Sequence, residues 1–410
     1  MEKLKIDKYF KRMQIRRNVH FQGIISSLKY RMAVVIPVYG EYAYIGKTLT
    51  SLTNNSSDFL KMTFVLLVIN NPTEADGSSY IKQNLHLLRE LHDGSFQRKF
   101  QLNNLNLAWI DASQYGDELP GKGGVGMARK LGMDSCLNYI DWNEDPIMIS
   151  LDADTIVEKN YLESIDLFFN KYKDISAASI KFKHLPGKTP EEERAIREYE
   201  YSIRYYVDNL KKAGSPYAYN SIGSAMICRA DAYIRAGGMK LHRGGEDFYF
   251  MQALRKLGPI MELTDTTVSP SARPSDRVPF GTGPKVRECL DGFEIKLYNP
   301  KIFNVLKDTL HKIESWINNY DVTEPKKVLD LLAHEANDYF NLLNFDIIWP
   351  KIYTNNVKED SVLSIRGRNK LLWAFHVWFD AFKTLKFVHF LEKKYPELYS
   401  KVNIDYFKGE

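Results

Sequence analysis

The sequence predicts an α/β fold, in which a mainly parallel sheet is flanked by helices and followed by a C-terminal helical appendage. Apolar runs rich in β-branched residues alternate with segments of helical periodicity, as parallel strands joined by helices require. Several of these runs stop abruptly at polar residues. From about residue 292 onward only helical periodicity remains. These observations together favour a sheet first and a helical region after it.

Length and composition suit a protein with a sizeable core. The 410 residues exceed the usual size of one core, and 44% hydrophobic with 26% charged residues are ordinary for a globular chain, which excludes disorder. The net charge of +5 is too small to imply a nucleic-acid partner. Three widely spaced cysteines in no metal-ligand spacing indicate a reducing compartment, so we expect a cytoplasmic protein. The expected parts are a basic N-terminal helical extension (1–31), a main domain (32–290) and a helical C-terminal region (291–410).

The N-terminal extension is basic, with apolar residues such as Phe10 and Ile15 between its lysines and arginines. This pattern fits peripheral contact with an anionic membrane, here the inner face, and it equally fits a solvated helix packed on the main domain. No apolar run approaches the ~18 to 20 residues needed to span a bilayer. We therefore expect at most peripheral membrane contact.

The elements of the main domain follow in order. Residues 32–38 form a continuous apolar run, as expected of a strand covered on both faces. Thr189, Pro190 and Glu192 form a capping box that opens a long helix. The other predicted strands are 64–69, 105–110, 146–151, 177–182 and 221–227, and the predicted helices are 44–52, 81–91, 126–140, 161–172, 189–212, 231–236, 302–320, 325–343 and 361–394.

Polar residues stand where the predicted strands end. In open α/β sheets, ligands bind beyond the carboxyl ends of the strands, so these residues are expected to line one crevice. No glycine fingerprint follows the first strand and no phosphate-binding loop sequence occurs, which disfavours a dinucleotide-binding domain. The strand-end residues are Glu41, Asn70, Asn71, Asp111, Asp152 and Asp154.

Asp152 and Asp154 follow an apolar strand and lie on the same side of its tip. Two carboxylates so close repel each other unless a cation lies between them. Mn²⁺ or Mg²⁺ suits this position, because these ions take oxygen ligands and complete their shell with water and phosphate. An Asx turn that caps the next helix is the alternative interpretation.

Two further stretches suit a phosphate. Gly121 to Gly126 is a flexible loop that contains Lys122 and leads into a helix with Arg129 in its first turns. Arg273 and Arg277 lie in a segment rich in proline and glycine, where they can clamp a diphosphate or an acidic acceptor. The alternatives are a simple loop and structural salt bridges.

At this point the chain resembles glycosyltransferase family 2, inverting enzymes of the Rossmann-like GT-A fold, over roughly residues 32–258. The Gly244-Gly245-Glu246-Asp247 stretch also resembles the G-G-E-D loop of galactosyltransferase-type enzymes. The residues that carry the resemblance are Ile36-Pro37-Val38-Tyr39 with Glu41, Gly126 with Ala128-Arg129 and Gly132, Leu151-Asp152-Ala153-Asp154, and Gly244-Gly245-Glu246-Asp247.

The resemblance implies roles for these residues. Asp152 would contact the ribose or the metal, Asp154 would coordinate the metal, and Asp247 would be the catalytic base with Glu246 beside it. Lys122 and Arg129 lie where the family places diphosphate or nucleotide contacts. The full set of expected nucleotide-sugar contacts is Pro37, Tyr39, Glu41, Asn70, Asn71, Asp111, Lys122, Arg129, Asp152, Arg273 and Arg277.

The chain also departs from the family pattern. Asn70 and Asn71 stand where paired aspartates are common, which leaves the nucleotide base open. Lys130 follows Arg129 where the family usually has Asn. The Q-x-x-R-W sequence of processive polymer synthases is absent, so a single-sugar, non-processive transfer is expected.

The function that the resemblance implies is a metal-dependent hexosyl transfer, with inversion, from a UDP- or GDP-sugar to a hydroxyl group. The acceptor would be a saccharide, a lipid-linked molecule or a small hydroxyl compound. Two alternatives stay open. One is another enzyme of similar fold, a retaining GT-A glycosyltransferase or a sugar-phosphate nucleotidyltransferase. The other is a non-catalytic protein that binds a sugar nucleotide or a membrane surface.

Overall fold

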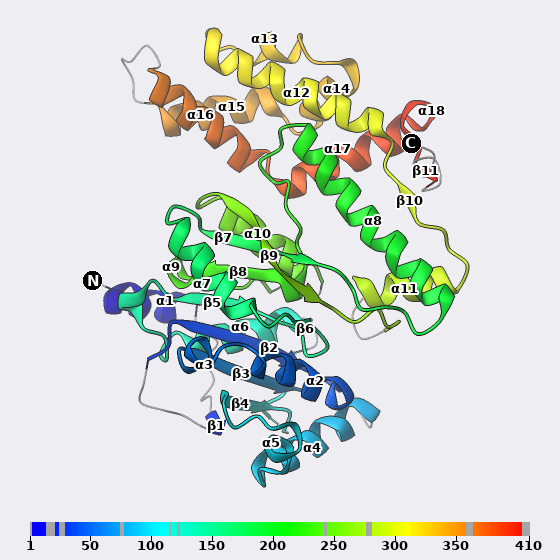
Figure 1. Ribbon diagram of the computed structural model, residues 1–410. Helices are drawn as coiled ribbons and strands as arrows, with labels where there is room; N and C mark the ends of the chain where they lie inside the picture. The colour runs from blue at the N-terminus through cyan, green and yellow to red at the C-terminus, as the bar shows by residue number, and fades with distance from the viewer. Residues whose placement is uncertain are drawn as a thin grey trace. The chain divides into compact units, whose positions relative to one another are not determined.

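The computed structural model of the chain describes residues 2–13, 21–23, 29–73, 78–114, 116–120, 124–241, 244–275, 281–357 and 364–403. The chain divides into two compact units (Figure 1). The first contains Met1–Arg197 and Ser221–Asp291, and the second contains Glu198–Asn220 and Gly292–Glu410. The C-terminal part of the second unit thus begins close to the expected boundary at 291, and a segment from the middle of the chain joins it.

A nine-stranded sheet, counted over the described residues, forms the centre of the first unit, in the order β1-β4-β3-β2-β5-β8-β7-β9-β6. Helices flank it (Figure 1). The strands are β1 (Phe21–Gly23), β2 (Met32–Val38), β3 (Thr63–Asn70), β4 (Asn106–Ala112), β5 (Ile147–Ser150), β6 (Ile156–Val157), β7 (Ala177–Phe182), β8 (Met226–Arg229) and β9 (Ile260–Ser269).

Most of the sheet runs in one direction. Strand β2 is parallel to β3 and to β5, β3 is parallel to β4, and β7 is parallel to β9. Strand β8 is antiparallel to both β5 and β7, so these two share a direction, while β1 and β6 run opposite to their neighbours at the two edges. The predicted α/β fold with a mainly parallel sheet is confirmed.

The helices of the first unit connect these strands. Helix α6 packs against β2 and β3, where glycine allows close approach: a Cβ on Gly132 would lie 2.4 Å from Val35 Cγ1. The helices are α1 (Glu2–Met13), α2 (Tyr42–Thr53), α3 (Ser57–Lys61), α4 (Ser79–His92), α5 (Ser95–Phe100), α6 (Gly124–Cys136), α7 (Tyr161–Lys171), α8 (Pro190–Lys212), α9 (Ala230–Arg235), α10 (Glu246–Arg255) and α11 (Thr282–Leu290), with 3₁₀ turns η2 (Trp142–Glu144) and η3 (Gly223–Ala225).

Local sequence signals placed many of these elements. Strands β2 and β7 have the predicted bounds, and α8 starts with the predicted cap, since Glu192 N donates to Thr189 Oγ1 at 3.2 Å. The predicted strand 221–227 has the wrong bounds: residues 223–225 form a 3₁₀ turn, and β8 begins only at Met226 and continues to Arg229. The Gly223 carbonyl of this turn accepts hydrogen bonds from Arg129 and Ser150, which the apolar composition did not indicate.

Strand β9 was not predicted. Its sequence, IMELTDTTVS, leaves several polar side chains exposed, and its register against β7 shifts between Ile180 and Lys181. Period-two alternation of apolar residues, the usual sequence sign of a half-buried strand, is therefore interrupted.

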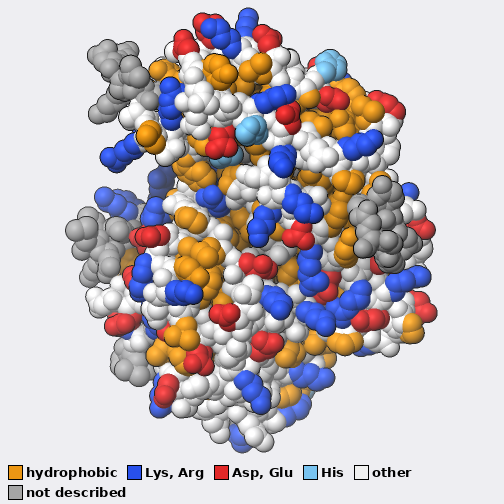
Figure 2. Space-filling model, turned by 45° about the horizontal axis from the view of Figure 1, so that its top comes forward, with side chains coloured by type: hydrophobic (Ala, Val, Ile, Leu, Met, Phe, Trp, Pro, Cys, Tyr) orange, Lys and Arg blue, Asp and Glu red, His pale blue; other side chains and the backbone are white. Residues whose placement is uncertain are grey.

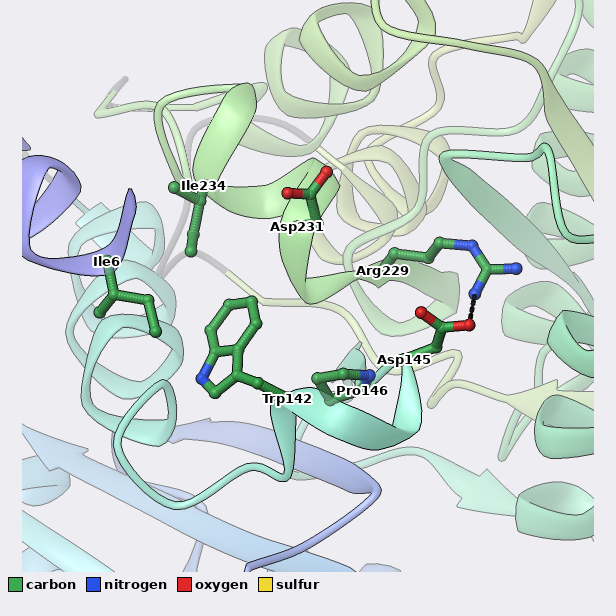
Figure 3. Close-up of a pocket in the computed structure, with 7 residues that line it drawn as sticks. All are labelled: Ile6, Trp142, Asp145, Pro146, Arg229, Asp231 and Ile234. Carbon is green, nitrogen blue, oxygen red and sulfur yellow. Dashed lines mark ion pairs between the residues drawn. The ribbon is translucent and has the colours of Figure 1, made fainter. Parts of the chain in front are cut away.

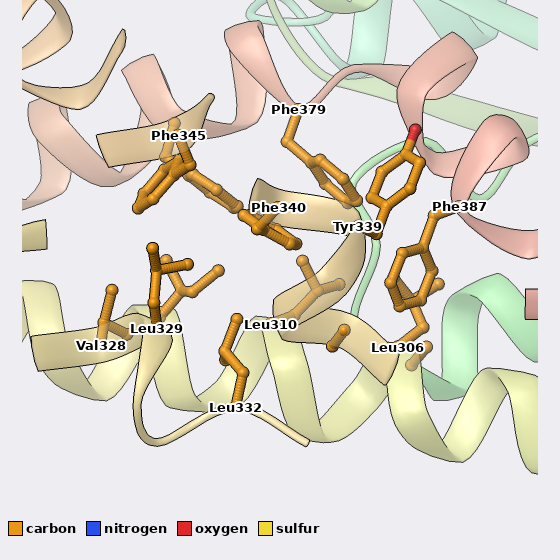
Figure 4. Close-up of a cluster of buried hydrophobic side chains, with 14 of the residues drawn as sticks. Leu306, Leu310, Val328, Leu329, Leu332, Tyr339, Phe340, Phe345, Phe379 and Phe387 are labelled. Carbon is orange, nitrogen blue, oxygen red and sulfur yellow. The ribbon is translucent and has the colours of Figure 1, made fainter. Parts of the chain in front are cut away.

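The second unit is helical around one apolar cluster, in which Phe340, Phe345 and Phe379 are buried (Figure 4). Phe375 and Phe387 of the last two long helices, and Phe379 between these helices, belong to this core. Its elements besides the end of α8 are β10 (Lys296–Leu297), α12 (Pro300–Asn319), α13 (Pro325–Leu329), α14 (His334–Leu342), α15 (Phe345–Asn356), α16 (Ile365–Trp378), α17 (Ala381–Lys394), α18 (Pro396–Tyr399) and β11 (Val402–Asn403).

Helix boundaries in this unit differ from the predicted ones. The segment 325–343 is two helices, and 361–394 splits where the Asp380 side chain accepts from Lys383 N to cap α17. Helix α15 was missed because Pro350 lies inside it, and proline normally ends a helix. Asn344, with φ of +52°, turns the chain into α15.

The N-terminal helix packs on the first unit through Tyr9, which is buried, while Lys8, Lys11 and Arg12 are exposed. This supports the packed-helix interpretation of the extension and leaves membrane contact untested. No helix among the described residues is both long and apolar enough to cross a bilayer. On the face drawn in Figure 2, basic and acidic side chains are interspersed, in keeping with the net charge of +5.

Candidate active site

The carboxyl ends of four neighbouring parallel strands carry the polar residues singled out in the sequence. Strands β4, β3, β2 and β5 are adjacent, so their ends lie along one edge. Asp111 and Asn70 lie in the last residues of β4 and β3, Glu41 follows β2, and Asp152 follows β5. The fold thus brings together residues that are far apart in the sequence.

Arg129, near the start of α6, contacts the β5 end of this edge and is only 3% exposed. Its Nη2 donates to Asp152 Oδ1 at 2.7 Å, and its Nε donates to Glu246 Oε1 at 3.4 Å. Burial disfavours its charge, but Asp152 and Glu246 raise the pKa of Arg129 above its ordinary value. One buried cation therefore joins the strand-end aspartate to the acid pair.

Two neutral groups complete the surroundings of Arg129. Its Nη1 donates to Ser150 Oγ at 2.8 Å and to the Gly223 carbonyl at 3.2 Å, and Ser150 Oγ donates to the same carbonyl at 2.7 Å. A Cβ on Gly223 would lie 2.2 Å from Arg129 Nη2, so only glycine fits there. Sequence analysis missed Ser150 and Gly223; the one available sign was a serine inside an apolar strand.

Arg273, in the loop after β9, forms the second ion cluster. Its Nη2 lies 2.5 and 2.6 Å from the two carboxylate oxygens of Glu41 and 2.9 Å from Asp154 Oδ2. The guanidinium lies 4.0 Å above the centre of the Tyr44 ring, a cation–π contact. Salt bridging, the alternative considered for this arginine, is what the structure contains. Its side chain is 17% exposed, so a ligand can reach it.

Asp152 and Asp154 each pair with a different arginine. The repulsion between them, from which a metal was inferred, is offset here by guanidinium groups. Their oxygens nevertheless fit a hard divalent cation, since Mn²⁺ and Mg²⁺ are commonly held by one or two carboxylates together with phosphate oxygens. Among the described residues, no group of three or more His, Cys, Asp or Glu side chains can hold a metal ion. A metal at this edge would depend on bound phosphate for further ligands.

The acid pair opens α10 after a glycine with φ of +74°, Gly245. Glu246 is buried against α6, where a Cβ on Gly126 would lie 2.9 Å from Glu246 Cβ. Asp247 is half-buried and accepts from Phe248 N at 2.7 Å. Burial, and then the charge of Glu246, raise the pKa of Asp247 to about 7. A carboxyl group with this pKa can take up a proton near neutral pH.

Asn71 and Asp111 have local hydrogen-bond partners. Asn71, 4% exposed, donates to the Ser113 carbonyl at 2.9 Å and accepts from Asn84 Nδ2 at 2.9 Å. Asp111 Oδ1 accepts from Ser113 N at 3.0 Å and from Ser113 Oγ at 2.7 Å. These contacts shape the loop after β4, so Asn71 in particular stabilises the edge from inside.

The remaining candidates divide between described and undescribed residues. Pro37 is buried in β2, and the half-buried Tyr39 ring lies 5.2 Å from that of Tyr80. Lys122 and Arg277 lie outside the described residues.

A cavity of about 170 Å³ opens beside Asp154 and Arg273. Thr48 in its wall donates to the Ala153 carbonyl at 2.8 Å, which ties α2 to the strand-end loop. The residues that line this cavity were not predicted, because they come from segments far apart in the sequence. The lining residues are Tyr44, Lys47, Thr48, Asp154, Ile156, Leu185, Pro186, Lys188, Glu192, Ser271, Ala272 and Arg273.

A smaller cavity of about 60 Å³ lies at the opposite end of β5 (Figure 3). Pro146, in its wall, immediately precedes β5, and Ile6 comes from α1. Arg229 Nη1 and Asp145 Oδ2 are 4.0 Å apart there. Because Asp152 follows the other end of this strand, the small cavity is separate from the candidate site.

No protein-family model matches the chain, and no curated protein matches it by sequence. The chain is similar to the crystal structure of S. aureus TarS 1-349 in complex with UDP-GlcNAc. The match covers 82% of this chain and 95% of the TarS chain, with 14% sequence identity and a TM-score of 0.44. The chain is also similar to the structure of mannosyltransferase PcManGT from Pyrobaculum calidifontis in complex with GDP-Man and Mn²⁺. This match covers 92% of this chain and 95% of the PcManGT chain, with 12% sequence identity and a TM-score of 0.37. At these values the function has to be argued from this chain's own residues.

Proposed function

We propose that this protein is an inverting, metal-dependent glycosyltransferase of GT-A type, similar to family 2, that transfers one hexosyl group from a nucleoside diphosphate sugar to a hydroxyl acceptor. The observation that carries the proposal is that one buried arginine, Arg129, contacts both the Asp152 carboxylate and Glu246 of the Glu246–Asp247 pair. A strand-end aspartate suits the donor, and a carboxyl group of pKa near 7 suits the acceptor. The compartment inferred from the cysteines is the cytoplasm.

Donor binding is assigned to the strand-end edge. The nucleotide would lie along the ends of β2 and β3, near Tyr39 and Asn70, with its diphosphate toward Asp152, Asp154 and Arg273. Arg273 contacts the carboxylates of Glu41 and Asp154, and its planar guanidinium can equally bind a diphosphate through paired hydrogen bonds. When bound, Mn²⁺ or Mg²⁺ would neutralise charge on the departing diphosphate. Asp152 and Asp154 would hold it.

Asp247 is assigned the role of base. As the acceptor oxygen forms its bond to the anomeric carbon, the bond from that carbon to the diphosphate oxygen breaks on the opposite face, and Asp247 takes the hydroxyl proton. This arrangement inverts the anomeric configuration. Glu246 is buried and bound to Arg129, so it would orient Asp247 and Arg129.

Two alternatives remain to be tested against this proposal. A retaining glycosyltransferase or a sugar-phosphate nucleotidyltransferase would use the same edge for a nucleotide but would not need Asp247 as a base. A non-catalytic protein would bind a sugar nucleotide without turnover. The half-buried position of Asp247 beside a buried glutamate favours catalysis, because strongly raised carboxyl pKa values cluster at functional sites.

The test begins with a panel of UDP- and GDP-sugars, including UDP-GlcNAc and GDP-Man, screened for thermal stabilisation with and without Mn²⁺. The best donor is then incubated with saccharide, lipid-linked and small hydroxyl acceptors, and the anomeric configuration of any product is determined by NMR. We expect one nucleotide series to stabilise the protein, more strongly with Mn²⁺, and a product of inverted configuration. A retained configuration, or binding without turnover by any acceptor, would select one of the alternatives.

A further inference from the structure

A second buried polar cluster lies against α6, next to the groups already described, and the proposed reaction does not use it. It joins Tyr9 of α1 and Tyr233 of α9 to Lys130 and Asp134 of α6. Tyr9 Oη donates to Asp134 Oδ1 at 2.6 Å, and Tyr233 Oη donates to the same oxygen at 2.7 Å. Lys130 Nζ donates to Asp134 Oδ2 and to Tyr9 Oη, each at 2.9 Å.

The cluster is almost fully withdrawn from water. Lys130 is 5% exposed, Asp134 6% and Tyr9 5%, and Tyr233 is fully buried. Burying a lysine–aspartate pair costs desolvation energy that their attraction barely repays, so such a pair is weak evidence for stability as such. A buried, fully hydrogen-bonded network instead fixes the relative positions of the elements that contribute to it. Here those elements are α1, α6 and α9.

Two of these connections reach the candidate active site. Arg129 and Lys130 are consecutive in α6, so the segment that presents Arg129 to Asp152 is also held by the contacts of Lys130. Gly238, with φ of +70°, lies against the cluster: a Cβ there would be 2.2 Å from Tyr9 Oη and 2.8 Å from Lys130 Nζ. Gly238 begins the segment that leads to the acid pair.

The same segment is held by α6 at a second point. A Cβ on Gly126 would lie 2.9 Å from both the Lys240 carbonyl oxygen and Glu246 Cβ. Tyr233 also packs its ring against Phe250 of α10, with 5.8 Å between ring centres. The cluster therefore contacts the described parts of the chain that flank Glu246 on both sides.

We propose that Tyr9 and Lys130 are positioning residues, which hold α6 and the turn at Gly238 so that Arg129 and the acid pair keep their places. The N-terminal helix is then part of the frame of the active site. This inference rests on the proposed function for its effect on rate. It also accounts for Lys130, which stands where the family that the chain resembles usually has Asn.

Tyr9→Phe is the first test, because it removes one hydroxyl and leaves Asp134 bonded to Tyr233 and Lys130. We expect faster amide hydrogen exchange at residues 238–241 and 244–247 than in the parent, with other regions unchanged. With the best donor and acceptor, we expect kcat to fall about 10- to 100-fold, since small misplacements near the chemistry have effects of this size. The donor Kd should stay within about twofold.

Tyr161→Phe is the matched control. Tyr161 is also fully buried, but its hydroxyl has no hydrogen-bond partner in the described structure, so its loss should change neither exchange nor rate. Tyr233→Phe serves as the second variant if Tyr9→Phe does not fold, since it removes the other hydrogen bond to Asp134 Oδ1. Parental exchange and parental kcat in the variant that folds would overturn the proposal.

The double variant Lys130→Met/Asp134→Leu separates positioning from stability. It removes both buried charges at once, so no charge is left unpaired, while the loss of Asp134 as acceptor for the Tyr9 and Tyr233 hydroxyls should lower the Tm modestly. In this variant too we expect faster amide hydrogen exchange at residues 238–241 and 244–247, and a lower kcat. A double variant with parental kcat would overturn the positioning role. If the parent transfers no sugar, the proposed function fails, and the exchange measurements alone decide whether the cluster holds the acid segment.

Discussion

The Nη2 of Arg129 and the Oδ1 of Asp152 are 2.7 Å apart, and this buried pair is the link between the strand-end carboxylates and the acid pair. The sequence predicts a metal ion next to Asp152, and in the structure the Arg129 guanidinium also supplies positive charge there. The Nε of the same guanidinium donates to Glu246 Oε1 at 3.4 Å. Substitutions at this junction should therefore affect donor and acceptor functions together.

Arg129→Met should destabilise the protein by about 3 to 5 kcal/mol, because it leaves the buried Glu246 and the partly buried Asp152 without their cation. Since the charge of Arg129 lowers the pKa of Asp247, its loss should also move the midpoint of the pH–rate profile upward. Urea unfolding and initial rates between pH 5 and 9 measure the two effects.

Arg235→Met is a suitable control for this variant. Arg235 pairs with Asp231 at 3.3 Å on the surface of α9, and its side chain is 53% exposed. Exposed ion pairs contribute roughly 0 to 1 kcal/mol, so stability and rate should hardly change. If Arg129→Met lowers the unfolding free energy and the rate no more than Arg235→Met does, the buried contacts of Arg129 are no more important than an exposed ion pair.

The pH dependence of rate should follow Asp247. Burial and the charge of Glu246 raise its pKa from 3.8 to about 7, and a base acts only when deprotonated. We expect kcat/KM to rise as the pH increases through about 7 and then to level off. Asp247→Asn should lose at least about a hundredfold in rate while it retains donor binding. A variant rate within a few-fold of the parent would remove Asp247 from this role.

The Asp247 carboxyl group should also make the free energy of unfolding depend on pH. Asp247 binds a proton more tightly in the folded protein than in the unfolded chain. Its protonation therefore stabilises the fold fully below pH 3.8, and this stabilisation is lost as the pH rises to about 7. Asp247→Asn should flatten the decline of unfolding free energy with pH in this window. Urea titrations at several pH values test this. An unchanged slope in the variant would mean that the raised pKa is not realised.

Arg273→Ala should increase the affinity of the nucleotide-free protein for Mn²⁺. Arg273 lies between Glu41 and Asp154, so it competes with any cation for their oxygens. We expect a gain of about tenfold, equivalent to ~1.4 kcal/mol, measured by electron paramagnetic resonance of free Mn²⁺. Turnover should fall, since the diphosphate loses a partner.

Asp154→Ala serves as the control for the Arg273 experiment. It should abolish Mn²⁺-dependent nucleotide binding and leave the fold intact, and the Asp154→Ala/Arg273→Ala double variant should show no gain in Mn²⁺ affinity. Nucleotide affinity that is the same in EDTA and in Mn²⁺, with parental turnover by Asp154→Ala, would contradict the metal role.

Gly126→Ala should lower the rate more than its effect on stability explains. The new methyl group would lie 2.9 Å from Glu246 Cβ and would displace the acid pair, at a cost of about 1 to 3 kcal/mol. Gly132→Ala is the comparison, because it overpacks the same helix against Val35 instead. Equal losses of kcat in two variants of equal stability would mean that contact with the acid pair at Gly126 has no specific role.

The sequence by itself determined the local elements and the positions where chemistry is concentrated. Apolar runs with period two or 3.6, a capping box before α8 and glycines before α10 are short-range patterns, and they place Asp152, Asp154, Glu246 and Asp247 at the ends of their elements. Strand β9 was not predicted because its sequence lacks a regular apolar period, and helix α15 was not predicted because it contains a proline.

Only the tertiary structure decided which charges meet. Arg129 and Glu246 are 117 residues apart in the sequence, and Arg273 and Glu41 are 232 apart. Local periodicity carries no information about such pairs, because a side chain's partner depends on strand order and on how closely glycines let helices approach. The assignment of two arginines to the two aspartates, and of Tyr9 to the helix behind them, follows from that packing alone.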